Sequence, residues 1–241
     1  MFHKLSIILP TYNEKENVVK MVSSLRAIFV SAEIIVVDDN SLDGTLDLAA
    51  KMAEEDSLLR IIKRSSKRSL VASLQEGINM ASGEIVVWMD CDFSMPPDIV
   101  SQLTDAVGKG FDISVGSRYV KGGGDFRGFG VRTIASVVIN RMAKYLLNTN
   151  INDLTSGFIA ARKNVLEQVP LRGIYGEYCI DFLVRAQRFG YKIKEIPYSC
   201  VPRRGGKTKT ASNPVVFLYN GFNYLAKIIS LMKEFNKNEN K

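Results

Sequence analysis

The sequence predicts an α/β fold in which helices flank both faces of a mainly parallel sheet. Apolar segments of strand length alternate with helix-like segments, which is the pattern of a parallel sheet. The apolar segments are continuous rather than alternating, as expected for strands that helices cover on both sides. The predicted strands are residues 5–9, 33–37, 58–62, 85–89 and 112–115, with a later one within 192–201.

Length and composition are those of a soluble globular protein. The chain has 241 residues, of which 46% are hydrophobic and 24% charged. We expect a main domain over residues 1–211 and a C-terminal amphipathic helix with a polar tail over residues 212–241. The net charge of +7 predicts attraction to anions such as phosphate-bearing ligands, acidic lipid surfaces or nucleic acid.

Cysteine and histidine usage argues against several kinds of site. Cys91, Cys179 and Cys200 are widely spaced, which favours neither a disulfide framework nor a zinc site and indicates a reducing compartment. His3 is the only histidine and lies near the terminus, which disfavours histidine catalysis. The apolar segment before Pro10 is too short for a signal peptide or a membrane span, so we expect a cytoplasmic protein.

Capping residues and apolar spacing predict the helices in order. Asn13, with Glu16 three residues later, predicts the start of the first helix, and Asp43 with Gly44 that of the second. The basic run 63–68 carries no motif and is expected to be a solvated loop.

The second half begins with the glycine-rich segment 121–130, which predicts a mobile loop followed by a helix with apolar residues at helical spacing. Asn213 as a cap and Pro214 at the first helical position then predict a terminal helix. Its expected apolar face consists of Leu218, Phe222, Leu225, Ile229 and Met232. Polar residues interrupt the opposite face, which argues against a transmembrane helix. Packing on its own domain, a membrane surface and a docking partner remain alternatives for this face.

Two carboxylates one residue apart follow the fourth predicted strand. Asp90 and Asp92 therefore emerge at the edge of the sheet where ligands bind in open α/β folds. Adjacent carboxylates repel each other unless a cation or a proton intervenes, and Mg²⁺ or Mn²⁺ takes one or two such ligands together with substrate phosphates. The alternative is a turn with helix-capping aspartates, which a lone Asp-x-Asp pattern does not exclude.

Two other strand ends carry polar residues at the same edge. Asp38 and Asp39 end the second predicted strand, where a carboxylate can accept hydrogen bonds from a nucleobase or a ribose. Residues 10–14 end the first strand, where Tyr12 can stack on a base or bond to it. Three acidic strand ends at one edge favour a ligand site over capping alone.

Five ordered motifs resemble those of family 2 glycosyltransferases. They are Pro-Thr-Tyr-Asn-Glu, Val-Asp-Asp-Asn-Ser-Leu-Asp-Gly-Thr, Met-Asp-Cys-Asp-Phe-Ser-Met-Pro-Pro, Val-Gly-Ser-Arg-Tyr-Val-Lys-Gly-Gly and Asp-Leu-Thr-Ser-Gly-Phe. The match spans residues 5 to about 210 and is similar to the dolichol-phosphate mannosyltransferase group of polyprenyl-phosphate hexose synthases. The resemblance implies a GT-A fold, with a Rossmann-like mixed sheet, that binds a nucleotide sugar and a divalent metal.

The resemblance also implies residue roles on the donor side. By motif position, the nucleoside is held by Pro10, Tyr12, Glu14, Val37 and Asp39, and the metal and diphosphate by Asp90, Cys91 and Asp92. The pattern Arg-x-x-Gly-x-Ser/Thr-Lys places Arg203 and Lys209 over the donor phosphates. Ser94 stands where the family often has glutamine, and segment 68–72 departs from the usual glycine-rich version.

On the acceptor side, Arg118 matches the family arginine that meets a phosphate, and Arg132 and Ser136 match as well. Arg132 and Ser136 are four residues apart at a predicted helix start, where they share a face beside free backbone N–H groups and favour an anion. Asp181 falls where the group has an acidic residue that orients the acceptor or an arginine. Glu177 is a competitor for this role, and stabilisation of the helix dipole is the alternative for both carboxylates.

We therefore predict an inverting, metal-dependent transfer of mannose from GDP-mannose to dolichyl or another polyprenyl phosphate. The catalytic set would be Asp92, Arg118, Asp181 and Arg203. A phosphate monoester is already largely ionised at neutral pH, so no strong general base is needed. Transfer of glucose or another hexose from a UDP donor is the enzymatic alternative, and a non-catalytic nucleotide- or RNA-binding module is the alternative of another class.

The predicted partners follow from this reaction. They are the nucleotide sugar, the lipid phosphate, a membrane surface and, as an alternative for the terminal helix, a membrane-anchoring partner. RNA-recognition motifs are absent, so nucleic acid is not among them. We expect the protein to lie peripherally on the cytoplasmic face of a membrane.

Overall fold

One mixed sheet organises the protein. The computed structural model describes residues 4–128, 130–206 and 214–239. The strands of the sheet are β1 (Leu5–Thr11), β2 (Glu33–Asp38), β3 (Leu59–Lys63), β4 (Ile85–Trp88), β5 (Ile113–Ser117), β7 (Ile159–Arg162) and β8 (Ile193–Pro197). Their order is β3-β2-β1-β4-β7-β5-β8, and all neighbours are parallel except at β7, which runs antiparallel to β4 and β5. The predicted mainly parallel sheet is therefore confirmed.

Strand β7 is the element that the apolar pattern missed. It has four residues, of which Ala160 and Ala161 are fully buried and lie opposite Val87 and Val86 of β4. Alanine is poor in strands generally, so this segment gives no strand signal by composition. Small side chains fit here because neighbouring strands and covering helices leave little space.

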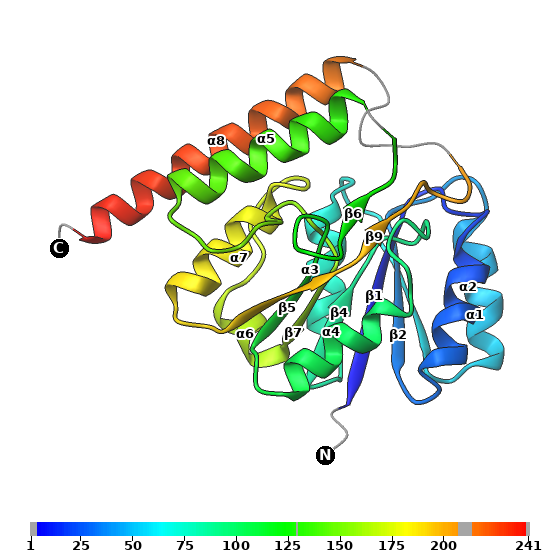
Figure 1. Cartoon of the computed structure of the whole chain (residues 1–241). Coiled ribbons are helices and arrows are strands. Elements are labelled where there is room, and N and C mark those ends of the chain that lie inside the picture. The colour runs from blue at the N-terminus through cyan, green and yellow to red at the C-terminus, as the bar shows by residue number, and fades with distance from the viewer. Residues whose placement is uncertain (1–3, 129, 207–213, 240–241) are drawn as a thin grey trace.

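Helices cover both faces of the sheet. They are α1 (Val18–Ile28), α2 (Thr45–Glu55), α3 (Leu70–Met80), α4 (Ile99–Gly108), α5 (Val131–Leu146), α6 (Lys163–Gln168), α7 (Tyr178–Arg188) and α8 (Pro214–Glu239). Ile7 and Leu9 of β1 pack into one core with α1, α2 and α4, whereas Ile8 packs into the other with α3, α6 and α7. Figure 1 shows this layered arrangement.

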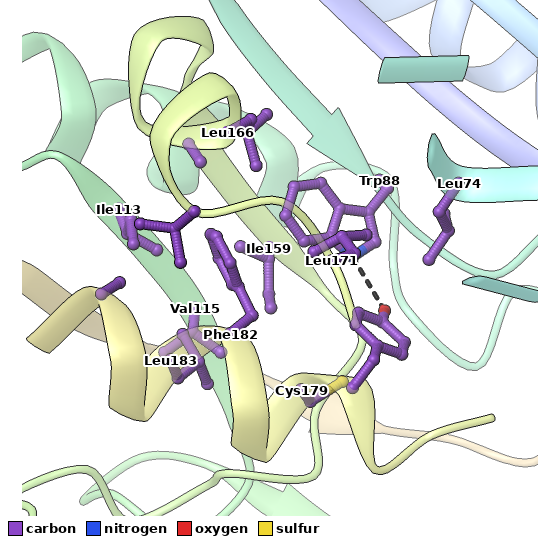
Figure 2. Packing of buried hydrophobic residues seen from close by; sticks show 14 of the residues in the cluster. Leu74, Trp88, Ile113, Val115, Ile159, Leu166, Leu171, Cys179, Phe182 and Leu183 are labelled. Atoms are coloured by element: carbon purple, nitrogen blue, oxygen red, sulfur yellow. Dashed lines mark hydrogen bonds between the residues drawn. The ribbon is translucent and has the colours of Figure 1, made fainter. Parts of the chain in front are cut away.

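The core that contains Ile8 also joins β4 to α7. In Figure 2, Phe182, Leu183 and Cys179 project from one helix toward the sheet. Trp88 meets Phe182 edge to face, with ring centroids 5.8 Å apart, and its indole N–H donates to Tyr178 Oη at 2.9 Å. This bond satisfies the buried polar group of each ring, so α7 is fixed against the end of the strand that precedes Asp90.

The first helix begins later than predicted. Asn13 has a φ of 52° and is not the cap; its Oδ1 accepts from the backbone N–H of Leu42 at 2.9 Å. The helix starts at Val18, after Asn17. Residues 12–17 therefore form a turn that carries Glu14 across the end of β1.

The glycine-rich segment 121–130 is more ordered than predicted. It contains β6 (Gly124–Asp125), which pairs with β9 (Ser199–Cys200) in a two-stranded parallel sheet. The segment predicted as one strand within 192–201 thus divides into β8 and β9. This pairing fixes Asp125 in a buried position and places Arg127 beside it.

Helices α5 and α8 lie side by side above the carboxyl ends of the parallel strands (Figure 1). Ile228 and Leu231 anchor α8 in the core, but the predicted apolar face is largely exposed: Leu218, Phe222 and Ile229 are each more than half exposed. The helix therefore packs on its own domain through a neighbouring stripe. Asn213 lies outside the described residues. Among the residues described, no helix is long and apolar enough to cross a membrane.

Candidate functional site

A cavity of about 950 Å³ opens at the carboxyl ends of the strands. Its lining has a polar part, mainly at the strand ends, and an apolar part, mainly on two helices. The polar lining comprises Asp90, Asp92, Arg118, Arg127, Ser136 and Arg203. The apolar lining comes mainly from the two adjacent helices, with Val138, Ile139 and Met142 of α5 and Phe217, Leu218, Phe222 and Leu225 of α8. The cavity could therefore hold a ligand that is charged at one end and hydrocarbon at the other.

Asp90 and Asp92 lie where β4 ends. The carboxylate of Asp92 is oriented by a turn in which its Oδ1 accepts from the backbone N–H of Ser94 at 3.0 Å. Asp90 is exposed to the cavity, although the protein around it partly desolvates its carboxylate. This desolvation, followed by the charges of Asp92 and Glu14, raises the pKa of Asp90 to about 7. The two carboxylates thus carry more negative charge than their surroundings neutralise.

A divalent cation would relieve this repulsion. Hard cations such as Mg²⁺ prefer oxygen ligands and commonly use one or two protein carboxylates together with substrate phosphates. In the described part of the chain, no group of three acidic, cysteine or histidine side chains is placed to hold a metal. The donor set at Asp90 and Asp92 therefore fits a metal that needs a substrate to complete its coordination.

Arg203 joins the carboxylate of Asp92, at the end of β4, to that of Glu14, at the end of β1. Its Nη2 donates to both carboxylate oxygens of Glu14, at 3.0 and 2.9 Å, and its Nη1 lies 3.6 Å from Asp92 Oδ2. Its Nε donates to the carbonyl of Gly205 at 2.6 Å, and the same carbonyl accepts from the Asn17 amide at 3.2 Å. The predicted residues Glu14, Asp92 and Arg203 are thus brought together although they are far apart in sequence.

The predicted nucleoside residues at the end of β2 are held by arginines that the sequence analysis assigned to a solvated loop. Arg64 is buried and pairs with Asp39, and its Nε donates to Glu76 at 2.8 Å. The Oδ2 of Asp39 accepts from the backbone N–H of Ser69 at 2.7 Å. Arg68 lies over the ring of Tyr12, with Cζ 4.2 Å from the centroid. The prediction of a solvated loop is wrong for Arg64, because a buried carboxylate needs a partner.

Two of the predicted donor residues are apolar and have almost no exposed side chain. Val37 is fully buried between the sheet and α3, and Cys91 is 2% exposed in the opposite core. These two residues can meet a ligand through the backbone. Pro10 lines the cavity beside Asp90 and Asp92, as predicted. Lys209 lies outside the described residues.

Arg118 lines the cavity and is the centre of a buried hydrogen-bond network. Its Nε and Nη2 donate to the two oxygens of Asp153, each at 2.7 Å, and Nη2 also donates to Thr155 Oγ1 at 2.8 Å. Ser136 Oγ lies 3.2 Å from Thr155 Oγ1 and accepts from Tyr119 Oη at 2.9 Å. The structure therefore brings Arg118 and Ser136 together. Asp153 belongs to a quoted motif, but nothing in its spacing signalled this pairing.

The cavity contains a second arginine that the sequence analysis did not single out. Arg127 donates through Nε and Nη2 to the two oxygens of Asp125, at 2.9 and 2.6 Å. Arg118 Nη1 lies 3.4 Å from the same carboxylate. Hydrogen bonding by Arg127 lowers the pKa of Asp125 against the effect of burial, which by itself would raise it. The side chain of Arg132 lies outside the described residues, although its backbone belongs to the first turn of α5.

Asp181 contacts an arginine, which is one of the two roles predicted for it. It is buried on α7, where its carboxylate accepts from Arg185 Nε at 2.8 Å and from Lys227 Nζ of α8 at 3.2 Å. It does not belong to the cavity lining. The competitor Glu177 accepts from the backbone N–H groups of Ile174 and Tyr175, at 2.6 and 3.1 Å. Asp181 thus ties α8 to the domain, and Glu177 shapes the turn before α7.

Comparison with known proteins identifies the family of the chain. Residues 6–169 match the family model "Glycosyl transferase family 2". The chain is 33% identical over 235 residues to a protein named dolichol-phosphate mannosyltransferase from Pyrococcus furiosus, covering 95% of this chain and 64% of the relative. It is 35% identical over 216 residues to a polyprenol monophosphomannose synthase from Mycolicibacterium smegmatis, covering 87% of this chain and 82% of that one.

Solved structures share the fold. A glucosyl-3-phosphoglycerate synthase from Mycobacterium tuberculosis, in complex with Mn²⁺, UDP-glucose and phosphoglyceric acid, superimposes with a TM-score of 0.72 at 20% identity. The match covers 96% of this chain and 80% of that chain. The chain also spans somewhat less than two thirds of the Pyrococcus relative.

Proposed function

The chain belongs to glycosyltransferase family 2, and we propose that it transfers mannose from GDP-mannose to the phosphate of a polyprenyl lipid such as dolichyl phosphate. We propose inversion at the sugar C1 and dependence on Mg²⁺ or Mn²⁺. The names of two relatives, each at least 33% identical to this chain, support mannose as the sugar and polyprenyl phosphate as the acceptor.

The observation that carries this proposal is the mixed character of one cavity. Its polar part contains Asp90, Asp92 and Arg203, and its apolar part runs between α5 and α8. A nucleotide sugar needs the first environment, whereas an isoprenoid chain needs the second. A single cavity with both parts would bring the lipid phosphate to the sugar donor.

The protein groups would act mainly by positioning and by charge. An acceptor phosphate is ionised at neutral pH, so alignment of its oxygen with the sugar C1 replaces general base catalysis. Asp90 and Asp92 would hold the divalent ion, which when bound supplies positive charge to the departing diphosphate. Arg203, held by Glu14 beside Asp92, would add a second positive charge there.

The proposal extends to a peripheral site on the cytoplasmic face of a membrane. Exposed apolar side chains follow α5 and α8, including Ile134, Val138, Leu218, Phe222 and Ile229. The apolar part of the cavity lining comes mainly from the same two helices. A lipid surface of anionic composition would suit both these side chains and the net charge of +7. A membrane-anchoring partner protein at this face is the alternative outcome.

The reaction can be tested with purified full-length protein, Mn²⁺ or Mg²⁺, a short polyprenyl phosphate and a panel of nucleotide sugars. We expect lipid-linked mannose from GDP-mannose, with loss of product after chelation of the metal. If lipid-linked hexose forms from a UDP donor instead, the donor is a UDP-sugar and not GDP-mannose. No lipid-linked sugar from any donor would refute it.

Substitution at the metal site provides the matched test. Asp92→Asn should lower turnover by about 100-fold or more, because it removes a ligand and a charge. Asp98→Asn is the control, since Asp98 is an exposed aspartate at the start of α4, outside the cavity lining. Equal activity of the two variants would contradict the assignment of Asp92 to a metal site.

A further inference from the structure

Arg127 is a cavity arginine that the proposed reaction does not yet use. It lines the cavity together with Asp90, Ser136 and Arg203. Its side chain is 42% exposed, whereas that of Arg118 is 5% exposed.

Residues close to Arg127 in the same chain hold its side chain in one orientation. Both oxygens of Asp125 accept from it, and the Asp125 side chain is 4% exposed. Asp125 is itself fixed by the pairing of β6 with β9 and by Arg118, whose Nη1 lies 3.4 Å away. A guanidinium has about five N–H donors in a planar fork, and Asp125 uses two of them. The donors on the opposite edge are therefore oriented in advance.

Arg118 already directs most of its N–H donors at protein acceptors, so fewer of them are left for a ligand than in Arg127. Asp153 and Thr155 engage its Nε and Nη2, and Asp125 lies nearest its Nη1. Its burial and its bidentate partner fit a role in positioning the loop around Asp153. Asp125 contacts both Arg118 and Arg127. The buried network around Arg118 therefore also orients Arg127, whose cationic group a ligand can reach.

We propose that Arg127 is a phosphate-binding residue of this cavity. The inference rests on the proposed function insofar as that function supplies two phosphate-bearing substrates. The lipid monophosphate and the donor diphosphate offer the same chemistry, namely oxygen acceptors that suit one edge of a guanidinium. Arg127 is linked through Asp125, Arg118 and Thr155 to Ser136, which the family resemblance assigns to the acceptor, so the lipid phosphate is the expected source.

Binding measured without turnover tests this assignment. Calorimetry would compare wild type and Arg127→Gln for a short polyprenyl phosphate, for the matching polyprenol, and for GDP with Mn²⁺. We expect Arg127→Gln to lose about tenfold or more in affinity for the lipid phosphate and to bind the polyprenol as wild type does. A loss confined to GDP would assign Arg127 to the diphosphate and would also support phosphate binding.

Arg60→Gln is the matched control. Arg60 is 39% exposed and donates to the buried carboxylate of Glu33 at 3.0 Å, but it lies on β3 outside the cavity lining. Unchanged affinity of Arg127→Gln for both phosphate ligands, or an equal loss in Arg60→Gln, would overturn the proposal. If Arg127→Gln fails to fold, Arg127→Lys keeps the charge without the bidentate fork and should show a smaller loss in the same measurements.

The two proposals fail separately. Wild-type protein that forms no lipid-linked sugar but binds the lipid phosphate through Arg127 would refute the proposed reaction and support this residue assignment. Protein that transfers mannose equally well with Arg127→Gln, at saturating and at limiting concentrations of both substrates, would refute the assignment and support the reaction.

Discussion

At the scale of single residues, the buried pair of Arg64 and Asp39 has a measurable effect on stability. Both side chains are nearly inaccessible, with 3% and 6% exposed. Removal of one partner leaves a buried charge uncompensated, so Arg64→Met should lower the free energy of unfolding by about 3 to 5 kcal/mol. Urea denaturation at neutral pH would measure this loss.

Arg60→Met is its control, since Arg60 is 39% exposed and a pair of this kind contributes roughly 0 to 1 kcal/mol. Asp39→Asn combined with Arg64→Met should recover part of the loss, because the orphaned carboxylate is then gone. Equal destabilisation by Arg64→Met and Arg60→Met would contradict the role given to burial.

Asp90 should make the stability of the metal-free protein depend on pH. Its folded pKa is raised to about 7, so between its ordinary pKa and 7 the folded state binds a proton more tightly than the unfolded state. The resulting stabilisation is present at low pH and is lost as the pH rises through 7. Asparagine does not titrate, so Asp90→Asn should lack this pH-dependent part of the free energy of unfolding.

Thermal melts of metal-free wild type and Asp90→Asn from about pH 5 to about pH 8 would measure the difference. The Tm of wild type should fall relative to that of the variant as the pH increases. Mn²⁺ added at the higher pH should restore the wild-type Tm and leave the variant less affected. Parallel pH profiles of Tm for the two metal-free proteins would show that the pKa of Asp90 is not raised in the folded state.

The placement of site residues could be predicted where it depends on local sequence. Residues 10–14, 38–39 and 90–92 follow apolar strands, and the parallel sheet brings them to one edge as expected. Pairings such as Arg64 with Asp39 and Arg118 with Asp153 join segments at least 25 residues apart. They depend on tertiary packing, which no local pattern encodes.

At the scale of elements, the alternation of strands and helices in the first half of the chain followed from the sequence, whereas β6 and β7 and several boundaries and faces did not. The start of α1 moved because Asn13 bonds to the loop around Leu42 instead of capping a helix. The exposed stripe of α8 was predicted as its apolar face, yet a second set of apolar residues, including Tyr224, Ile228 and Leu231, makes the contact with the domain. A helix with two apolar stripes does not reveal by spacing which one is buried.

Gly176 tests how α8 is docked. A Cβ at this position would overlap Tyr224 Oη of α8. Gly176→Ala should therefore displace α8 and lower stability by about 1 to 3 kcal/mol, as overpacking of a filled core does. Hydrogen exchange of the amides in residues 222–232 would report the displacement as weaker protection.

Tyr224→Phe removes the overlapping hydroxyl, so the double variant Gly176→Ala with Tyr224→Phe should regain much of the protection. The control is Gly108→Ala, because a Cβ at Gly108 meets nothing within 4 Å. Failure of the double variant to recover would mean that α8 is not positioned through this contact.

At the scale of the whole molecule, different elements supply the polar and the apolar side chains of the cavity. The strand ends place the carboxylates and arginines in the polar part of the lining, and α5 with α8 places hydrocarbon in the apolar part. The Lys227 contact to Asp181 holds α8 where it closes this cavity. Of the exposed stripe of α8, Leu218, Phe222 and Leu225 line this cavity, whereas Ile229 lies outside the lining, where a lipid surface could meet it.

Vesicle binding tests this arrangement. Ile134 and Ile229 are 66% and 52% exposed on α5 and α8 and do not belong to the cavity lining. A fully buried aliphatic side chain is worth about 1.5 to 3 kcal/mol, so Ile134→Ser combined with Ile229→Ser should weaken sedimentation with anionic vesicles by roughly tenfold or more. Val30→Ser with Leu42→Ser is the matched control, because these side chains are 74% and 84% exposed on other segments. Both double variants should keep the wild-type affinity for GDP with Mn²⁺, since neither changes the polar part of the lining. Equal sedimentation of all three proteins would show that the α5 and α8 face does not meet lipid, and the acceptor would then have to reach the cavity with the help of a partner protein.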